Sequence, residues 1–84
     1  MRIDKFLKVS RILKRRTLAQ EACEGGKVKV NGKSVKPSVR IKVGDVVELG
    51  FNSGTLKFCV KQLKDTVKKE DAENLYEIII DEVN

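Results

Sequence analysis

The stretch RTLAQEACEGGKVKVNGK, residues 16–33, contains the change of hydrophobic period that decides the fold. Its first half carries apolar residues at helical spacing, namely Leu18, Ala19, Ala22 and Cys23. The pair Gly25-Gly26 then predicts a helix end, because glycine permits left-handed backbone angles. After it, Val28 and Val30 alternate with lysines up to Asn31-Gly32, a strong hairpin-turn signal. The stretch therefore predicts a short helix followed directly by a β-hairpin.

Another amphipathic helix is predicted just upstream, over RIDKFLKVSRILKRR, residues 2–16. At about 100° per residue, one side carries Ile3, Phe6, Val9 and Leu13, and the opposite side carries Lys8, Arg11 and Arg15. Asp4 is placed to cap this helix, and Thr17 and Gln20 have the spacing of a capping box for the next one. We expect one face of the first helix to pack and the other to be free to bind.

Period-two alternation downstream of the hairpin predicts further strands. Pro37 interrupts the return strand of the hairpin or marks its edge. The next strands are expected over residues 39–43, 46–51 and 56–60, the last of which could extend to Leu63. Turn signals at Gly44-Asp45 and Asn52-Ser53-Gly54 separate them. The sheet should be small, antiparallel and strongly twisted.

The C-terminal stretch allows two interpretations. Apolar residues recur there at helical spacing, namely Ala72, Leu75, Tyr76, Ile79, Ile80 and Val83. They predict a C-terminal helix, but Ile78 to Ile80 are β-branched, so a short helix that ends in a strand is also open. The fold class is α+β, with two short N-terminal helices packed on a small twisted antiparallel sheet, plus the C-terminal helix. We expect one domain over residues 1–84, with a core over 1–63 and a helical extension over 64–84.

Charge is divided unevenly along the chain. It has 18 Lys and Arg against 12 Asp and Glu, a net charge of +6. Residues 1–42 hold 13 basic and 3 acidic residues (+10), whereas residues 43–84 hold 5 basic and 9 acidic residues (−4). This asymmetry predicts a polyanion-binding surface in the N-terminal half. The alternative is a basic half that only keeps the protein soluble.

Several classes of protein are disfavoured by what the sequence lacks. No apolar run approaches the roughly 18–20 residues that cross a bilayer, so we expect a cytoplasmic protein with no membrane contact. Cys23 and Cys59 are far apart and the chain has no histidine, which argues against a zinc site or a histidine-based triad. We expect both thiols to be core residues in a reducing compartment, a disulfide being the alternative. A chain of 84 residues with no phosphate-cradling glycine loop is expected to be neither an enzyme nor a holder of a cofactor or metal.

Three segments resemble the S-four RNA-binding domain, also called alpha-L. They are RIDKFL at 2–7, KRRTLAQEACEGGKVKVNGKSVKPS at 14–38 and KVGDVVEL at 42–49. They share with the family an Arg-x-Asp-x-x-Leu start, a short helix ending in glycine, a Gly-x-Val-x-Val-Asn-Gly hairpin and a closing Gly-Asp, over roughly residues 1–50. With KDTVKKEDAENLYE at 64–77, the whole chain resembles free-standing members that act in bacterial ribosome-associated quality control and, more distantly, a small heat-shock ribosome-binding protein.

The resemblance implies a module that binds structured ribosomal or transfer RNA. For the quality-control group it implies a place on a 50S-type large ribosomal subunit that carries an obstructed peptidyl-tRNA. There the protein would help to hold the tRNA while a tail-elongating factor adds a C-terminal alanine tail to the stalled chain. Heat-shock rescue of blocked subunits and ribosome assembly are alternatives, and a monomer is expected.

The candidate RNA-binding residues are mainly the basic side chains of the helical region, because guanidinium forks on a rigid helix suit phosphate oxygens. They are Arg2, Lys5, Lys8, Arg11, Lys14, Arg15 and Arg16, with Asp4 and Thr17 beside them and Lys27, Lys29 and Lys33 on or near the hairpin. Asp4 is interpreted first as an N-cap, although the family pattern also lets such an acid orient a neighbouring arginine. Thr17 is a cap or part of a phosphate site. The hairpin lysines extend the RNA-binding surface or form a solvated sheet face.

The aromatic residues Phe6, Phe51, Phe58 and Tyr76 fall on apolar stripes. They are therefore predicted to be core residues rather than a base-stacking platform, so the protein should recognise RNA shape and phosphates instead of sequence. A different class of function is an adaptor for another protein. It would act through the acidic residues of the C-terminal helix, Glu70, Asp71, Glu73 and Glu77.

Overall fold

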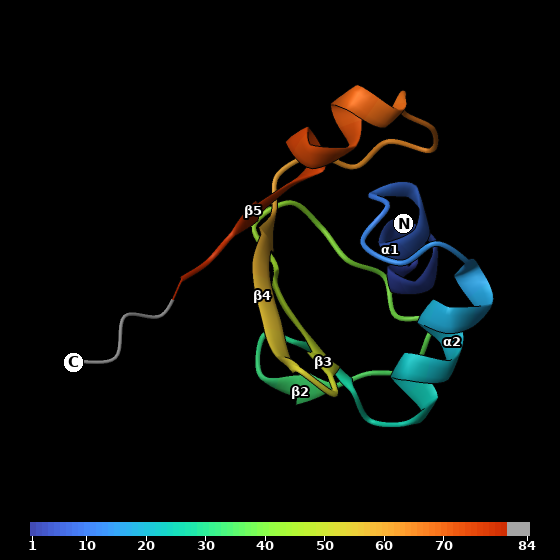
Figure 1. The fold of residues 1–84 in the computed structure, drawn as a ribbon, viewed down its shortest axis with the longest axis vertical. Coiled ribbons are helices and arrows are strands. Elements are labelled where there is room, and N and C mark those ends of the chain that lie inside the picture. Colours follow the sequence, from blue (N-terminus) through green and yellow to red (C-terminus); the bar gives the residue numbers. More distant parts are fainter. Residues whose placement is uncertain (81–84) are drawn as a thin grey trace.

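The computed structural model of the protein describes residues 1–80 and has a twisted sheet with a helical layer on one side (Figure 1). The helices are α1 (Ile3–Val9), α2 (Arg16–Glu24) and the 3₁₀ helix η1 (Lys69–Leu75). The strands are β1 (Val28–Val30), β2 (Lys33–Ser34), β3 (Val46–Phe51), β4 (Gly54–Val60) and β5 (Tyr76–Ile78). The α+β class expected from the sequence is confirmed.

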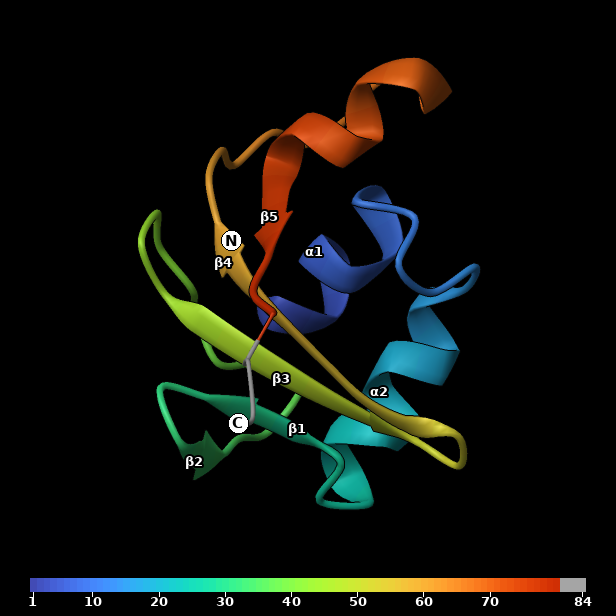
Figure 2. The same cartoon turned by 60° about the vertical axis from the view of Figure 1, so that its left-hand side comes forward.

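The five strands form one sheet in the order β2-β1-β3-β4-β5, and every neighbouring pair is antiparallel. Both α1 and α2 lie on the same side of this sheet, and η1 lies beside α1 at one end (Figures 1 and 2). The chain order brings β1 against β3 in the middle of the sheet and leaves the short β2 at an edge. The N-terminal half therefore supplies the helical layer together with part of the sheet.

The β1–β2 hairpin forms where the sequence predicts it. Asn31 (φ 51°) and Gly32 (φ 87°) both have left-handed backbone angles, as a two-residue hairpin turn requires. The Asn31 side chain also joins the hairpin to β3, because its Oδ1 accepts the Val46 N–H at 3.0 Å and its Nδ2 donates to Asp45 at 3.1 Å. The return strand ends at Ser34, before Pro37, as expected.

The core lies between the helical layer and the inner face of the sheet. Val47, Leu49, Phe58 and Val60 alternate with more exposed residues along β3 and β4 and are fully buried or nearly so. Phe6 of α1 stacks on Phe58 with ring centroids 6.1 Å apart. Burying each such side chain contributes about 1.5–3 kcal/mol, so these contacts fix α1 on the sheet.

The first helix is much shorter than the helix predicted over residues 2–16. It ends at Val9, because the buried Ser10 donates its hydroxyl to the Leu7 carbonyl at 3.3 Å and Arg11 adopts a left-handed φ of 62°. The Leu13 N–H then bonds to the Leu7 carbonyl at 3.0 Å. The chain therefore turns back here, and Lys8, Arg11 and Arg15 do not share one continuous helical face.

Both capping predictions are wrong. Asp4 lies inside α1, whose N-cap is Arg2, and α2 begins at Arg16 with Arg15 as its N-cap. Neither helix has a side-chain cap, so Thr17 and Gln20 do not form a capping box. In the apolar stripe of α2, Ala19 and Cys23 are buried and Ala22 is half-buried, but Leu18 is exposed.

The strand predicted over residues 39–43 is absent. This segment instead runs beside the N-terminus, where Arg40 forms an isolated antiparallel bridge with Arg2. The Val39 carbonyl accepts the Ile3 N–H at 2.8 Å, and the Ile41 N–H donates to the Met1 carbonyl at 2.9 Å. Of the apolar residues that alternate in this segment, Ile41 is buried, with the chain start rather than the sheet as its backbone partner, whereas Val43 is 59% exposed.

The C-terminal segment follows the alternative interpretation, a short helix that ends in a strand. Helix η1 ends at Leu75, and Tyr76–Ile78 pairs with β4 as β5. The β-branched isoleucines suit this extended conformation, so the longer helix over Tyr76–Ile80 is wrong. Ala72 and Leu75 are buried as predicted, whereas Val83 lies outside the described residues.

Candidate nucleic-acid interface

Asp4 is fully buried and organises the basic residues around it. Its two carboxylate oxygens accept hydrogen bonds from Arg2 Nη2 at 3.1 Å, Gln20 Nε2 at 3.1 Å and Arg16 Nη2 at 3.3 Å. Arg16 Nε lies 3.3 Å from the second oxygen, so the Arg16 fork contacts both. The Lys5 backbone N–H also donates to Asp4 at 2.8 Å. Asp4 is therefore paired with Arg2 and Arg16, an arrangement that the family pattern allows, and its part in RNA binding stays a prediction.

The ionised form of Asp4 is stabilised by these contacts. Burial alone would raise the pKa of the carboxyl, but hydrogen bonds from Gln20, Arg16 and the Lys5 N–H outweigh it and lower the pKa below 3.8. Asp4 is thus a fixed negative charge under two arginine side chains that are 42% (Arg2) and 43% (Arg16) exposed. Both arginines are thus tied to Asp4 while part of each side chain stays open to solvent.

A basic cleft opens beside these arginines. We use this name for the hollow lined by Met1, Arg2, Lys5, Arg16, Arg40, Leu63 and Asp65. Four of its side chains are cationic, and they come from both helices and from the 39–43 segment. Such a concentration of guanidinium and ammonium groups suits phosphate oxygens.

Sequence reasoning missed Arg40 and the role of Gln20. Arg40 enters the basic cleft because its backbone bridges to Arg2, a long-range contact that its place in an alternating stretch did not indicate. The Thr17-x-x-Gln20 spacing predicts a capping box, yet Gln20 donates to Asp4 across the two helices. Its position one turn after Arg16 was the available signal, since residues four apart share one helix face.

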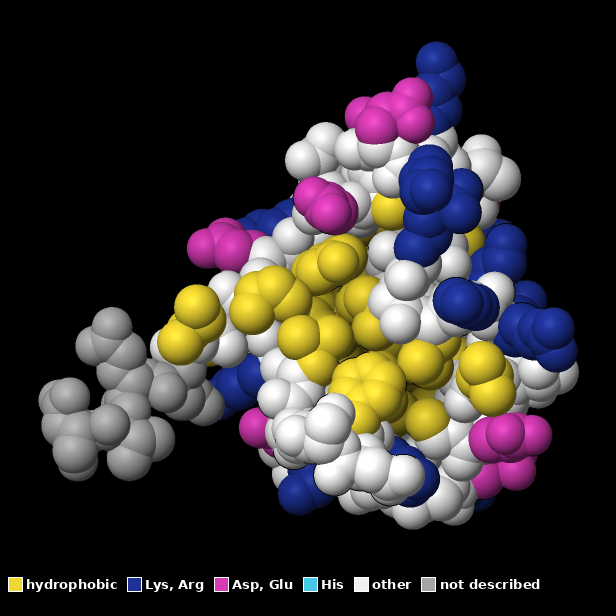
Figure 3. Space-filling model, viewed as in Figure 1, with side chains coloured by type: hydrophobic (Ala, Val, Ile, Leu, Met, Phe, Trp, Pro, Cys, Tyr) yellow, Lys and Arg dark blue, Asp and Glu magenta, His cyan; other side chains and the backbone are white. Residues whose placement is uncertain are grey.

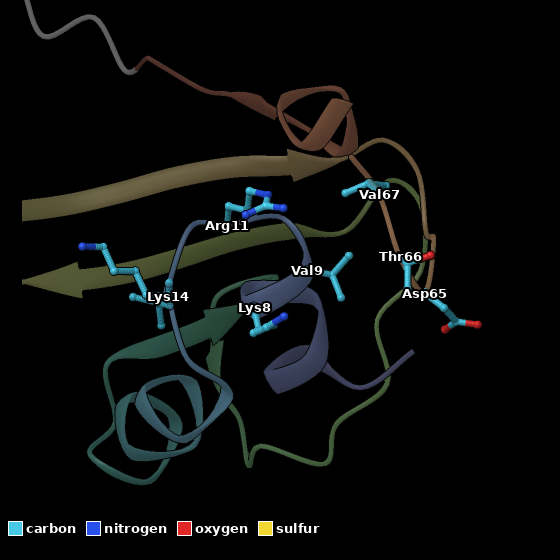
Figure 4. Close-up of a pocket in the computed structure, with 8 residues that line it drawn as sticks. Lys8, Val9, Arg11, Lys14, Asp65, Thr66 and Val67 are labelled. Carbon is cyan, nitrogen blue, oxygen red and sulfur yellow. The ribbon is translucent and has the colours of Figure 1, made fainter. Parts of the chain in front are cut away.

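A second basic hollow adjoins the first, and we call it the basic groove. It is lined by Lys8, Val9, Arg11, Leu13 and Lys14 and by the segment Asp65–Val67, which lies opposite Lys8 and Lys14 in Figure 4. In Figure 3, Lys and Arg side chains gather over the region where Figure 1 draws α1 and the chain leading to α2. Arg15 and Thr17 lie exposed at the start of α2.

The hairpin lysines are placed apart from the basic cleft. Lys29 stands opposite Glu48 in the β1–β3 register and alternates with the buried Val28, so it faces away from the helical layer. Lys27 and Lys29 line a hollow with Glu48 and Thr55, and Lys33 is exposed on the edge strand β2. Their part in RNA binding stays a prediction.

The aromatic residues are not gathered on one exposed surface. Phe6 and Phe58 are fully buried, and Tyr76 packs edge-on against Phe58 with ring centroids 5.5 Å apart. Phe51 differs from the prediction, because it is 44% exposed and lines a mainly apolar hollow with Leu13 and Leu18. The position of Phe51 at the end of β3, beside the turn, explains its exposure.

Other kinds of site find little support in residues 1–80. In that range no group of three or more His, Cys, Asp or Glu side chains could hold a metal ion, and no helix is long and apolar enough to cross a membrane. Both cysteines are free. Burial raises the pKa of the Cys23 thiol to about 11, with smaller contributions from Asp4 and Glu24, so this thiol is protonated at neutral pH.

The chain is similar in sequence to known proteins. The family model of the S4 domain, the S-four domain named above, matches residues 1–47. The "RQC P-site tRNA stabilizing factor" of Streptococcus pneumoniae is 53% identical over 79 residues, which cover 94% of this chain and 90% of that protein. The Bacillus subtilis protein of the same name is 48% identical and covers 98% of this chain, or 95% of its own length.

The fold is shared with a solved structure as well. The trimeric structure of heat shock protein 15 from Vibrio cholerae superposes with a TM-score of 0.88 at 31% identity, covering 94% of this chain and 81% of that one. The predicted resemblance is therefore confirmed at the level of sequence and of fold. The chain belongs to the S4 domain family.

Proposed function

We propose that this protein binds structured RNA of the large ribosomal subunit together with tRNA, in ribosome-associated quality control. The observation that carries the proposal is the pair Arg2 and Arg16, which the buried Asp4 holds at the mouth of the basic cleft. A positioned pair of guanidinium groups can engage phosphates without a large loss of side-chain entropy. The role of the relatives is stated in their name, P-site tRNA stabilizing factor.

Recognition would rely on the shape of the RNA. A-form RNA hides its base edges in a deep, narrow groove, so a cationic cleft whose lining residues include no aromatic side chain would contact phosphates and 2′-hydroxyls. The basic cleft would bind first, and the basic groove with Arg15 and Thr17 would extend the contact. Lys29 would touch RNA only if the RNA also reaches the opposite face of the sheet, and Lys27 and Lys33 would extend the contact only if the RNA reaches the start and the edge of the hairpin. The RNA-binding core would lie in residues 1–63.

The finer role follows the quality-control group. The protein would stabilise peptidyl-tRNA on an obstructed 50S-type subunit while a tail-elongating factor adds alanine residues to the stalled chain. It would act in the cytoplasm as a monomer, unlike the trimeric structure of the Vibrio relative. A heat-shock rescue role is the second candidate, supported by a 33% identical heat shock protein 15 homologue from Aeromonas salmonicida.

The first test is the double substitution Arg2→Ala/Arg16→Ala. We expect loss of co-sedimentation with ribosomes at physiological salt, because two positioned phosphate contacts disappear. The slope of log affinity against log salt should fall by roughly 1.4–1.8, since each contact contributes roughly 0.7–0.9. Circular dichroism and thermal unfolding of the variant would establish that it is folded, because both arginines also neutralise Asp4.

A matched control is available on the other face of the sheet. Lys57 and Lys61 alternate with the buried Phe58 and Val60, so Lys57→Ala/Lys61→Ala removes the same charge away from the basic cleft. This control should keep most of its ribosome binding. Unchanged co-sedimentation of a folded Arg2→Ala/Arg16→Ala variant would refute the proposed docking surface.

Crosslink mapping of the bound RNA would test the biological role. Large-subunit rRNA recovered together with peptidyl-tRNA would support quality control. Small-subunit rRNA alone would argue against it. Large-subunit rRNA without tRNA, recovered mainly after heat shock, would favour the rescue role.

The structure gives less support to the alternative function, an adaptor for another protein that acts through the C-terminal segment. The apolar side chains of η1, Ala72 and Leu75, are used in the core of the protein itself, and β5 is part of the sheet. Deleting residues 65–84 would therefore damage the fold rather than remove an appendage. Glu70→Gln/Glu73→Gln, which changes two exposed side chains, is the cleaner test of an adaptor.

A further inference from the structure

One acidic side chain lies between the two basic hollows. Asp65 lines both the basic cleft and the basic groove, and its Oδ1 accepts a hydrogen bond from Lys5 Nζ at 2.9 Å. Among the described residues that line these hollows, it is the only acidic one. The Asp65 carboxylate is thus paired with Lys5 on a surface whose other charged side chains are all positive.

The Lys5–Asp65 pair is open to solvent. The Asp65 side chain is 83% exposed and that of Lys5 is 37% exposed. The hydrogen bond from Lys5 and its positive charge lower the pKa of the Asp65 carboxyl below 3.8, so the group is ionised at neutral pH. An exposed pair of this kind is worth little and is screened by salt, so another anion can replace the carboxylate.

The chain around Asp65 can change its conformation without disturbing the core. Lys64, Asp65 and Thr66 are exposed and lie outside the helices and strands, whereas Leu63 and Val67 pack against the core on either side. Figure 4 shows Asp65–Val67 on the far side of the basic groove from Lys8 and Lys14. Movement between the two apolar anchors would change only a short exposed stretch.

We propose that Asp65 is a built-in competitor of the RNA backbone: its carboxylate occupies on Lys5 the place of an RNA phosphate and must leave when RNA binds. This inference rests on the proposed function. It assigns Asp65 as a residue that weakens RNA binding and so favours ligands whose phosphates fit the rest of the cleft. Exposed acidic residues elsewhere in the chain should have no such effect.

The test compares Asp65→Asn with the unmodified full chain, using fluorescently labelled bulk tRNA as the probe and anisotropy as the measurement. At low salt we expect the variant to bind roughly two- to fivefold tighter, the range that corresponds to one exposed ion pair. The advantage should shrink towards parity as salt rises, because the Lys5–Asp65 pair is screened.

Two controls separate competition from a general change of charge. Glu77→Gln on β5 removes the same charge and another solvent-exposed pair, Lys61 Nζ–Glu77 Oε2 at 3.2 Å. It should alter tRNA affinity much less than Asp65→Asn. In a Lys5→Ala background, Asp65→Asn should give little gain, because the cation that the carboxylate occupies is gone.

The outcomes are distinct. If the unmodified chain binds tRNA and Asp65→Asn gains no more than Glu77→Gln, the inference is wrong and the proposed function stands. An undiminished gain in the Lys5→Ala background would likewise refute it, because the effect would then be general repulsion. If the unmodified chain binds neither tRNA nor ribosomes, the proposed function fails, and the inference that rests on it fails too.

Discussion

Two carboxylates are paired with cations of the basic cleft, and they differ in burial and in the number of their partners. The Asp4 side chain is 0% exposed and is bound by Arg2, Arg16, Gln20 and a backbone N–H. The Asp65 side chain is 83% exposed and is bound by Lys5. Each has a lowered pKa, so each is a negative charge at neutral pH.

This difference in burial distinguishes a carboxylate that positions arginines from one that competes with RNA for a lysine. Water cannot replace the partners of Asp4 without opening the contact between α1 and α2, so this acid fixes the two arginines. Water or a phosphate can replace Asp65 at little cost. For these two carboxylates we expect burial rather than charge to decide the direction of the effect on RNA binding: removing Asp4 should weaken binding, whereas removing Asp65 should strengthen it.

The largest expected effect is on stability, from Asp4→Ala. We expect the free energy of unfolding to fall by about 2 kcal/mol, because hydrogen bonds to a buried charged group are lost while the half-exposed arginines can return to water. Urea unfolding followed by circular dichroism would measure it. Asp65→Ala serves as the control and should leave the urea midpoint almost unchanged. Equal losses in the two variants would contradict the distinction drawn between them.

Acid unfolding should separate the two carboxylates in a second way. The folded-state pKa of Asp4 lies below the unfolded value of 3.8, so its contribution to stability is present above that pH. It should be lost as pH falls through the folded-state pKa. Asp4→Asn should flatten the pH dependence of unfolding below about pH 4. Asp65→Asn should change this profile much less, because the exposed pair with Lys5 is screened by solvent and contributes little to stability although the pKa of Asp65 is also lowered. An unchanged acid profile in Asp4→Asn would show that Asp4 is not stabilised as an anion.

Much of the fold could be predicted because its signals are local. The Asn31-Gly32 turn specifies its own backbone angles, and the alternation over Val46–Phe51 marks the inner face of β3 without reference to the rest of the chain. The same holds for the glycine that ends α2, since Gly26 adopts φ 74°. Such features depend on neighbours in sequence, which the sequence itself supplies.

The contacts of Asp4 with Arg16 and Gln20 could not be predicted from local sequence patterns. Asp4 meets Arg16 and Gln20 over separations of 12 and 16 residues, and helical periodicity gives no information on contacts between two helices. Its helix position suggested a cap, which is the local role of such a residue. Arg40 was hidden for the same reason, because an isolated bridge to Arg2 takes the place of the strand that alternation predicted.

The smallest expected effect comes from exchanging the kind of cation, arginine or lysine, that is paired with each carboxylate. Arg16 contacts both oxygens of Asp4, through Nε and Nη2, each at 3.3 Å, whereas Lys5 reaches Asp65 through its single ammonium group. Arg16→Lys keeps the charge but loses this fork, so tRNA affinity should fall about fivefold, the equivalent of one net hydrogen bond of about 1 kcal/mol, with an unchanged salt slope. Lys5→Arg, measured in the same anisotropy assay, should change affinity less. Equal effects of the two exchanges would mean that Asp4 supplies charge to the cleft without orienting Arg16.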